Sequence, residues 1–579
     1  MIKKSNENKD LMTNSSVYRD VASKAKLLIS LTALFCVACS PEDSDLTEQD
    51  RTQDLLVYCS EGSPDSFNPQ LVTSGTSYDA TANILYNQLV TYKPGTTEIV
   101  PSLARSWDIS DDGLRYTFNL RQDVSFHTSQ VFTPSRSLNA DDVLFSFNRQ
   151  RLSSHPYHGI SGGRYPYFTA QSMDQLIKDI RKVNDHKVEF ILTRPESPFL
   201  SILATPFASI LSAEYAEQLN RLRRPEWIDS KPVGTGPFRF ERYEPDAYIR
   251  FKRFEDYFGD KRRVKNLVYA ITPDAAMRFA RFSAGECDVM SYPLPVHLRV
   301  AQKNDLQVVQ TPGLNIAYWA FNTEKPPFHD VKVRQALAMA VDRESILQTV
   351  YDRQASLATN PIPPSSWAYN KNVKKIPHSK RRALELLKEA GYENGFSIDI
   401  WAMPIQRAYN PNARKMAEII QQDLADINVD VRIVTYEWGT FLSRVSRGLH
   451  HSVLLGWNAD NADPNNFFSP LLSCASSVNG NNYANWCDNR FDELILKGRT
   501  SSKQSERKEY YDQAQEIFKQ QAPWLTIAHA NNSVLVQPRV KGFIISPIGN
   551  INFEGVTIGL PDQKQPRSQK QESDEVANQ

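Results

Sequence analysis

The length of the chain constrains its fold more than any other feature, because 579 residues are too many to pack around one hydrophobic core. Chains of this size divide into two or more domains. Hydrophobic residues make up 41% of the chain and charged residues 23%, which is ordinary composition for a globular protein. The sequence therefore predicts a multidomain globular protein.

Strand-like and helix-like segments are mixed along the chain. Alternation of polar and apolar residues predicts strands over residues 54–58, 114–120, 188–192 and 396–401. Helical spacing of apolar residues predicts helices over residues 331–350, 379–390, 412–427 and 506–521. Asp330 is the expected N-cap of the first of these helices. The mixture indicates the α/β class.

The charges of the chain are balanced. Lys and Arg number 67 and Asp and Glu number 66, so the formal net charge is +1. A chain without a field of one sign lacks the electrostatic footprint of a nucleic-acid-binding protein. We therefore expect no nucleic-acid partner.

The N-terminal region carries an export signal. Basic residues precede an apolar stretch over Leu27–Ala38, which is long enough for a signal-peptide core and too short to span a bilayer. Ala38 stands directly before Cys39, as in a lipoprotein cleavage site. We therefore predict a signal peptide over residues 1–39 and a periplasmic lipoprotein with lipid on Cys39. The alternative is cleavage after Ala38, which would release a soluble periplasmic protein.

Two polar segments flank the expected globular part. Residues 40–54 are polar and acidic, which predicts a flexible linker between the anchor and the first domain. Residues 561–579 are rich in Gln, Lys, Ser and Glu, which predicts a disordered tail.

Four cysteines lie outside the export signal: Cys59, Cys287, Cys474 and Cys487. In an oxidising compartment four thiols suggest two disulfides, with three possible connectivities. The pair Cys474–Cys487 closes a short loop rich in Asn, Ser and Gly, and would stabilise the fold by about 3 kcal/mol in the chain-entropy account. That pairing leaves Cys59 and Cys287 as a long-range pair.

The sequence contains no convincing catalytic constellation. It has no metalloprotease, nucleophile-elbow or Walker motif. Gly234-Thr235-Gly236 starts like a dinucleotide-binding fingerprint, but Arg239 stands at the third Gly position, so we predict a turn. Neighbouring side chains do not share a face, so His450-His451 is predicted to be a solvated pair and not a metal clip. We predict no catalytic residue, metal or cofactor; an envelope peptidase is the alternative of a different class.

Five motifs carry a resemblance to a known family. They are Val57–Pro64, Phe67–Gln70, Pro101–Trp107, Asn139–Val143 and Gly234–Phe238. With these motifs, the chain from Leu55 to about Leu560 resembles the solute-binding proteins of dipeptide and oligopeptide ABC importers, family 5, and within them the periplasmic dipeptide-binding members.

The resemblance implies a two-lobed periplasmic binding protein fold with mixed sheets and a hinge, of the type II-like cluster C. The implied parts are a first lobe over residues 55–314 with an extra subdomain at about 86–235, a second lobe over 315–527, and a returning segment of the first lobe over 528–560. The ligand is expected between the lobes, which close on it. The resemblance also supports the disulfides Cys59–Cys287 and Cys474–Cys487.

The resemblance assigns the two ends of a bound peptide. Arg407, in the segment 404–411, matches the residue that pairs with the peptide carboxylate, and Asp460 matches the residue that pairs with the ammonium. An enclosed zwitterion needs one partner of each sign, because an unpaired buried charge is costly. From the residues alone, the favoured interpretation of Arg407 is a surface arginine and that of Asp460 is a turn residue. The family has Gly where this chain has Ala459, so a methyl group stands beside the ammonium site.

Other residues are expected to line the pocket. The aromatic rings would pack against varied peptide side chains, and one loop would offer backbone groups to the peptide. These residues are Tyr409, Trp438, Gly456, Trp457 and the loop Thr73-Ser74-Gly75. The alternative for the aromatic residues is an ordinary place in the core.

These expectations define the function predicted from sequence. We expect a monomeric binding protein that captures a small peptide and delivers it to an ABC permease in the inner membrane. Within the same scaffold, haem, glutathione, antimicrobial peptides and longer oligopeptides are the alternative ligands.

Overall fold

The structure is a computed structural model that describes residues 54–260, 264–304 and 306–559. The predicted signal peptide, Cys39, nearly all of the linker and the predicted tail lie outside these residues. Helices and mixed sheets alternate along the described chain, which confirms the α/β prediction. Their apolar side chains form two large cores, one built from residues 56–271 with 534–556 and one from residues 314–530, so the molecule is two-lobed as predicted. The finer domain limits stay predictions.

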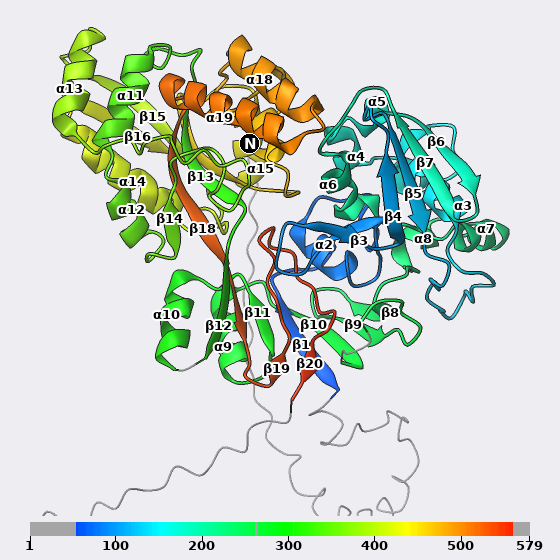
Figure 1. Cartoon of the computed structure of the whole chain (residues 1–579). Coiled ribbons are helices and arrows are strands. Elements are labelled where there is room, and N and C mark those ends of the chain that lie inside the picture. The colour runs from blue at the N-terminus through cyan, green and yellow to red at the C-terminus, as the bar shows by residue number, and fades with distance from the viewer. Residues whose placement is uncertain (1–53, 261–263, 305, 560–579) are drawn as a thin grey trace, which may run out of the picture. The chain divides into compact units, whose positions relative to one another are not determined.

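One mixed sheet runs through both lobes (Figure 1). Its first-lobe strands are, in spatial order, β11 (Val289–Ser291), β1 (Leu55–Ser60), β10 (Asn266–Ile271), β9 (Tyr248–Arg253) and β8 (Phe238–Glu244). β1 lies parallel to both of its neighbours. Leu56 and Tyr58 are fully buried, because the alternation seen in the sequence directs both side chains into the core. Helices α9 (Ala275–Ser283) and α10 (Pro295–Lys303) complete this part of the lobe.

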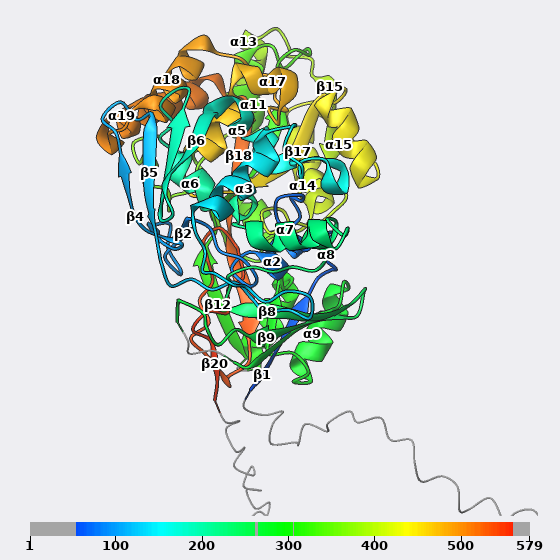
Figure 2. The same cartoon turned by 90° about the vertical axis from the view of Figure 1, so that its right-hand side faces the viewer.

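A separate four-stranded antiparallel sheet forms the subdomain of the first lobe. Its order is β4 (Ala104–Ile109), β5 (Arg115–Leu120), β7 (Lys187–Leu192) and β6 (Ile177–Asn184). Helix α3 (Ala140–Arg151) packs against β6 and β7 (Figure 2). α3 begins with a capping box, in which Asn139 and Asp142 bond each other's backbone amides. The short elements around this sheet are β2 (Val90–Tyr92), β3 (Ile99–Pro101), α2 (Gly75–Thr81), α4 (Pro166–Ala170), α5 (Met173–Leu176), α6 (Phe199–Leu203), α7 (Ala213–Arg221) and α8 (Trp227–Ser230).

The second lobe is built around the buried strand β13 (Asn315–Phe321). Its neighbours continue the large sheet in the order β17 (Ser452–Asn458), β15 (Phe396–Ala402) and β16 (Val429–Val434). All seven residues of β13 are buried, as expected for a central strand covered on both faces. The helices of this lobe are α11 (Val331–Ala340), α12 (Arg343–Thr349), α13 (Lys380–Glu389), α14 (Ala413–Ala425), α15 (Trp438–Ser446), α16 (Asn465–Leu472), α17 (Cys474–Asn479), α18 (Asn489–Thr500) and α19 (Gln504–Gln521).

Side-chain caps explain where most of these helices begin. Asp330, Ser379 and Asn412 each accept a hydrogen bond from a backbone amide of the helix that follows. The prediction of one helix over residues 331–350 is wrong, because Val341 is extended and Asp342 starts a second helix. The Asp342 carboxylate accepts from the amides of Glu344 and Ser345 at 3.1 and 3.3 Å.

Two chain segments run between the lobes. β12 (Gln307–Pro312) belongs to the first-lobe side and leads through Gly313 into β13. β18 (Trp524–Val536) is long enough to pair with β13 in the second lobe and with β11 and β12 in the first (Figure 1). β14 (Ala355–Leu357) also pairs with β18, and a small antiparallel sheet of β19 (Val540–Lys541) and β20 (Thr557–Ile558) lies near the end of the described residues.

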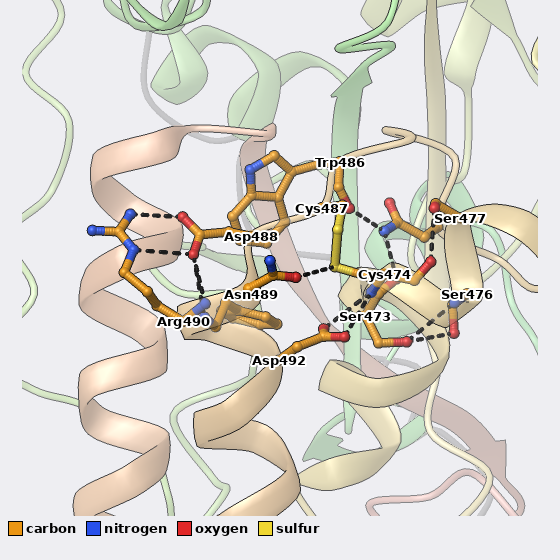
Figure 3. The surroundings of a disulfide bond; sticks show 12 residues. Ser473, Cys474, Ser476, Ser477, Trp486, Cys487, Asp488, Asn489, Arg490 and Asp492 are labelled. Atoms are coloured by element: carbon orange, nitrogen blue, oxygen red, sulfur yellow. Dashed lines mark hydrogen bonds and ion pairs between the residues drawn. A yellow bond between two sulfur atoms is a disulfide. The ribbon is translucent and has the colours of Figure 1, made fainter.

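Both predicted disulfides are present. Cys59 at the end of β1 is bonded to Cys287, just before β11, with Cα atoms 5.7 Å apart. Cys474 and Cys487 join the start of α17 to the segment before α18, with Cα atoms 4.5 Å apart (Figure 3). In the second case the Cys474 amide also donates to the Asp492 carboxylate at 3.0 Å. The short loop is therefore held by a covalent bond and by hydrogen bonds.

The predicted turn at Gly234-Thr235-Gly236 lies in an irregular segment in which the chain bends at residues 235–237. The Gly236 amide donates to the Leu85 carbonyl oxygen at 2.9 Å, and the turn lies directly on the backbone of residues 84 and 85. A Cβ atom on Gly234 would lie 1.9 Å from the Leu85 carbonyl oxygen. The turn therefore needs glycine for close packing and not for a nucleotide.

We predict that Gly234→Ala lowers the free energy of unfolding by about 1–3 kcal/mol, because the added methyl group overpacks this contact. Urea denaturation measures the change. Gly159→Ala is the matched control, since a Cβ atom there meets no atom within 4 Å. Equal stability of the two variants would contradict the packing explanation.

Candidate ligand-binding site

The two charged candidates lie on loops that leave the same edge of the second-lobe sheet. Arg407 follows β15 and Asp460 follows β17. β15 and β17 are parallel neighbours, with Ala402 opposite Leu454. Because parallel strands end at the same edge, both loops emerge there, which is the usual place for a ligand in an open α/β sheet.

Arg407 begins a tight four-residue turn. Its amide donates to the Asn410 carbonyl oxygen at 3.1 Å, and the Asn410 amide donates back at 3.0 Å. The Arg407 side chain is exposed, and its guanidinium lies 5.8 Å from the centre of the Trp438 ring. No carboxylate among the described residues forms an ion pair with it. Arg407 is thus an accessible cation with an aromatic ring beside it.

Tyr409 and Gly456 join the two loops to each other. A Cβ atom on Gly456 would lie 2.3 Å from the Tyr409 ring and 2.4 Å from the Ile316 carbonyl oxygen. The Tyr409 ring therefore packs against the β17 backbone at Gly456, where a side chain would clash with it. This contact brings the predicted pocket residues Tyr409 and Gly456 together, and it gives the Arg407 turn a fixed position against the strand that leads to Asp460.

Asp460 lies in a loop organised by Asn466. The Asn466 side-chain oxygen accepts from the Asp460 amide at 3.0 Å and from the Trp457 indole nitrogen at 2.9 Å. Burial raises the pKa of the Asp460 carboxyl to about 6, while polar contacts with Asn466 and Tyr167 act in the opposite direction. A half-buried carboxylate held in this way favours a cation as its partner.

Two aspartates of this loop differ in their partners. Arg507 donates to both oxygens of Asp463 at 2.8 and 2.7 Å, and both side chains are buried. Asp460 forms no ion pair with any described residue. The loop is therefore anchored by one complete ion pair and presents a second carboxylate without a cation.

The first lobe contributes residues that the sequence did not single out. The phenols of Tyr78 and Tyr167 both have a raised pKa, mainly through burial and also through the negative charge of Asp460, so they lie near that carboxylate. Tyr92 accepts a hydrogen bond from the Ala462 amide at 3.0 Å. These three tyrosines come from segments far from residue 460, so neither spacing nor a local motif could connect them with it.

The remaining candidates are the loop Thr73-Ser74-Gly75 and the buried residue Ala459. Thr73 and Gly75 are exposed and Ser74 occupies the N-cap position of α2, but its side chain bonds Ser77 at 2.9 Å instead of capping the helix. A Cβ atom on Gly75 would meet no atom within 4 Å, so space is open in front of this loop. Ala459, the departure from the family pattern, is buried, and its amide donates to the Leu314 carbonyl oxygen at 2.8 Å.

The histidine prediction requires a correction. His450 is fully buried, with its Nε2 atom 2.7 Å from the Tyr483 carbonyl oxygen, and burial lowers its pKa to about 4. The prediction of a solvated pair is therefore wrong for His450, because the preceding turn directs its ring into the second-lobe core. Within the described part of the chain, no three His, Cys, Asp or Glu side chains are grouped to hold a metal ion.

Residues 98–479 match the family described as "Bacterial extracellular solute-binding proteins, family 5 Middle". The chain belongs to this family. The family 5 assignment agrees with the resemblance seen in the sequence motifs. In the described residues of this family 5 protein, no helix has the length and apolar character needed to cross a membrane.

Individual relatives cover nearly the whole chain. The dipeptide-binding protein of Escherichia coli K12 is 50% identical over 504 residues, which is 87% of this chain and 94% of that protein. Heme-binding protein A of Haemophilus influenzae is 43% identical over 543 residues, covering 92% of this chain and 99% of that protein.

Solved structures share the fold. The dipeptide-binding protein of Pseudoalteromonas sp. SM9913 in complex with Met-Leu is 46% identical, with a TM-score of 0.76, and the match covers 87% of this chain and 100% of that one. HbpA2 of Haemophilus parasuis is 41% identical, with a TM-score of 0.82, covering 88% and 100%.

We predict that protonation of Asp460 stabilises the ligand-free protein. Its pKa is raised from 3.8 to about 6 on folding, so the folded state binds this proton more tightly than the unfolded chain. This contribution is fully present below pH 4 and is lost as the pH rises through 6. Urea denaturation from pH 4 to 7 should show a steeper loss of stability for the native protein than for Asp460→Asn. Parallel curves would contradict the burial of this carboxyl.

Proposed function

We propose that this protein captures dipeptides by their two charged ends and delivers them to an ABC importer. A dipeptide is a zwitterion whose ammonium and carboxylate are held a short distance apart whatever its side chains are. A receptor that grips only these ends can accept many sequences. Such a receptor needs a carboxylate and a cation at a fixed separation.

The main support for the proposal is a pair of oppositely charged side chains at one edge of the sheet. Among the described residues, Arg407 is exposed and forms no ion pair with a carboxylate, and Asp460 forms none with a cation, while the neighbouring Asp463 is paired with Arg507. The Arg fork can meet both oxygens of a peptide carboxylate. Asp460 would take the peptide ammonium, and the ring of Trp438 beside Arg407 would offer a flat surface to a peptide side chain.

The relatives support the same ligand class. One curated relative is a dipeptide-binding protein, and a structural relative is a complex with Met-Leu. We propose Tyr409, Gly456 and Trp457 as the second-lobe lining of the pocket, and the loop Thr73-Ser74-Gly75 as its backbone contact from the first lobe.

A second candidate ligand is haem, because one relative is named for haem binding and is 43% identical over 92% of this chain. Titration of the protein with haem, followed by its Soret absorbance, distinguishes the two. A saturable spectral change with haem and no heat with dipeptide would favour this candidate.

The proposal includes the mature N-terminus, because its processing decides whether the receptor is anchored to the membrane. Cleavage before Cys39 would leave a lipid-bearing cysteine and keep the receptor at the membrane, whereas cleavage after Ala38 alone would release it. A mass spectrum of the mature N-terminal peptide decides between them, since only the lipoprotein carries acyl mass on Cys39.

We predict tight binding of Ala-Ala that weakens at least a few hundred-fold, yet stays measurable, when either charged end of the peptide is removed. Calorimetric titration with Ala-Ala, N-acetyl-Ala-Ala, Ala-Ala amide and Ala-Ala-Ala measures this. Asp460→Asn and Arg407→Ala should each weaken Ala-Ala binding at least a few hundred-fold, because breaking a desolvated ion pair costs about 3–5 kcal/mol.

The control for Arg407→Ala is Arg414→Ala, which removes an exposed arginine that pairs only with Glu418 on the surface of α14. Native affinity in that control separates the loss of a ligand contact from the loss of a positive charge. Unchanged binding of Ala-Ala by Asp460→Asn would overturn the assignment of the ammonium site.

We also predict that the affinity for Ala-Ala falls as the pH drops below about 6. A protonated Asp460 cannot pair with an ammonium, and its pKa is raised to about 6 before the ligand binds. Titrations between pH 4.5 and 8 measure the dependence, with Asp460→Asn as the control that should lack it. A flat profile in the native protein would place the ammonium elsewhere.

A further inference from the structure

A strained turn lies between the Arg407 turn and the two strands that connect the lobes. These strands are β12 and β18, which we name the hinge strands. Residues 351–354, which we name the hinge turn, follow α12 and precede β14. Asp352 and Arg353 both have positive φ, 51° and 62°. Residues with a side chain rarely adopt this conformation, and two in succession persist only when the surrounding contacts impose it.

The hinge turn contacts both segments that connect the lobes. Gln354 accepts hydrogen bonds from the Gln310 side chain of β12 at 2.9 Å and from the Asn531 amide of β18 at 3.1 Å. Asp352 forms an ion pair with Arg299 of α10, in the first lobe, at 2.8 Å. The conformation of this turn is thus tied to the strands about which the lobes would move.

Tyr351 connects the hinge turn to the ligand loop. Its side chain is 2% exposed, and its hydroxyl donates to the Tyr409 carbonyl oxygen at 2.6 Å. Tyr409 lies inside the four-residue turn that begins at Arg407, and its ring is held against Gly456. The hydroxyl therefore fixes the backbone two residues after the guanidinium-bearing residue.

We propose that Tyr351 is a positioning residue that holds the Arg407 turn in place relative to the hinge strands, so that the guanidinium meets the peptide carboxylate. This inference rests on the proposed function, in which Arg407 binds that carboxylate. A two-bonded contact between guanidinium and carboxylate depends strongly on orientation. Without the hydroxyl, the Tyr409 carbonyl loses its buried donor and the turn loses its connection to residues 351–354.

The test compares two peptides on Tyr351→Phe. Ala-Ala uses Arg407 for its carboxylate, and Ala-Ala amide has no carboxylate to place. We expect the variant to bind Ala-Ala on the order of tenfold more weakly, as expected for one lost buried hydrogen bond, and to bind the amide as the native protein does. The ratio of the two affinities should therefore shrink about tenfold.

Two controls separate positioning from a general effect on the fold. Tyr157→Phe removes another buried hydroxyl, which donates to the Ala216 carbonyl oxygen at 2.7 Å in the first lobe, and should leave the ratio unchanged. In an Arg407→Ala background, Tyr351→Phe should have no further effect on Ala-Ala.

Equal weakening of both peptides, or an unchanged ratio in Tyr351→Phe, would overturn the role of Tyr351 while leaving dipeptide capture intact. A native protein that binds Ala-Ala and its amide equally would overturn the proposed role of Arg407, and the inference with it.

Discussion

The pairing of β13, β17 and β15 is the constraint on which the candidate site depends. This hydrogen-bonded ladder holds β15 and β17 parallel, so both strands run toward the same edge of the sheet and each continues into one charged loop. Gly456 strengthens the constraint, because only a residue without a side chain lets Tyr409 lie on β17. Arg407 and Asp460 are thus positioned by one lobe. This arrangement suits a receptor for a zwitterion of fixed length, because the distance between the two charged side chains does not change when the lobes move.

Ion pairing distinguishes residues that stabilise the fold from residues that are candidates for contact with a ligand. The buried pair Arg149–Asp229 in the first lobe and the pair Arg507–Asp463 beside the site are complete, with nitrogen–oxygen distances of 2.8 and 2.7 Å. Burial raises the pKa of Asp460, and no cation within the described part of the chain forms an ion pair with it. A protein retains such a group when a ligand supplies the missing charge.

Local signals in the sequence predicted local structure well. The cap at Asp330 could be predicted because a short polar residue precedes the apolar helical pattern. The break at Asp342 was missed, because the helical spacing of apolar residues continues across it. The backbone, in contrast, leaves the helical conformation at Val341. The disulfides followed from cysteine counting and from the family resemblance, and both are present. Arg407 and Asp460 were selected by the resemblance, and their role in binding stays a prediction.

Tyr78, Tyr92 and Tyr167 could not be found, because they approach residue 460 only after the two lobes fold. His450 was misjudged for a similar reason, as its burial depends on tertiary packing around Tyr483.

Dipeptide capture at this site is tested most directly by a crystal structure of the mature protein with bound Ala-Ala. We expect one dipeptide between the lobes, with its carboxylate on the Arg407 guanidinium and its ammonium on the Asp460 carboxylate. A dipeptide bound with its ends reversed, or with its charged groups on other residues while Arg407 and Asp460 remain unpaired, would contradict this expectation.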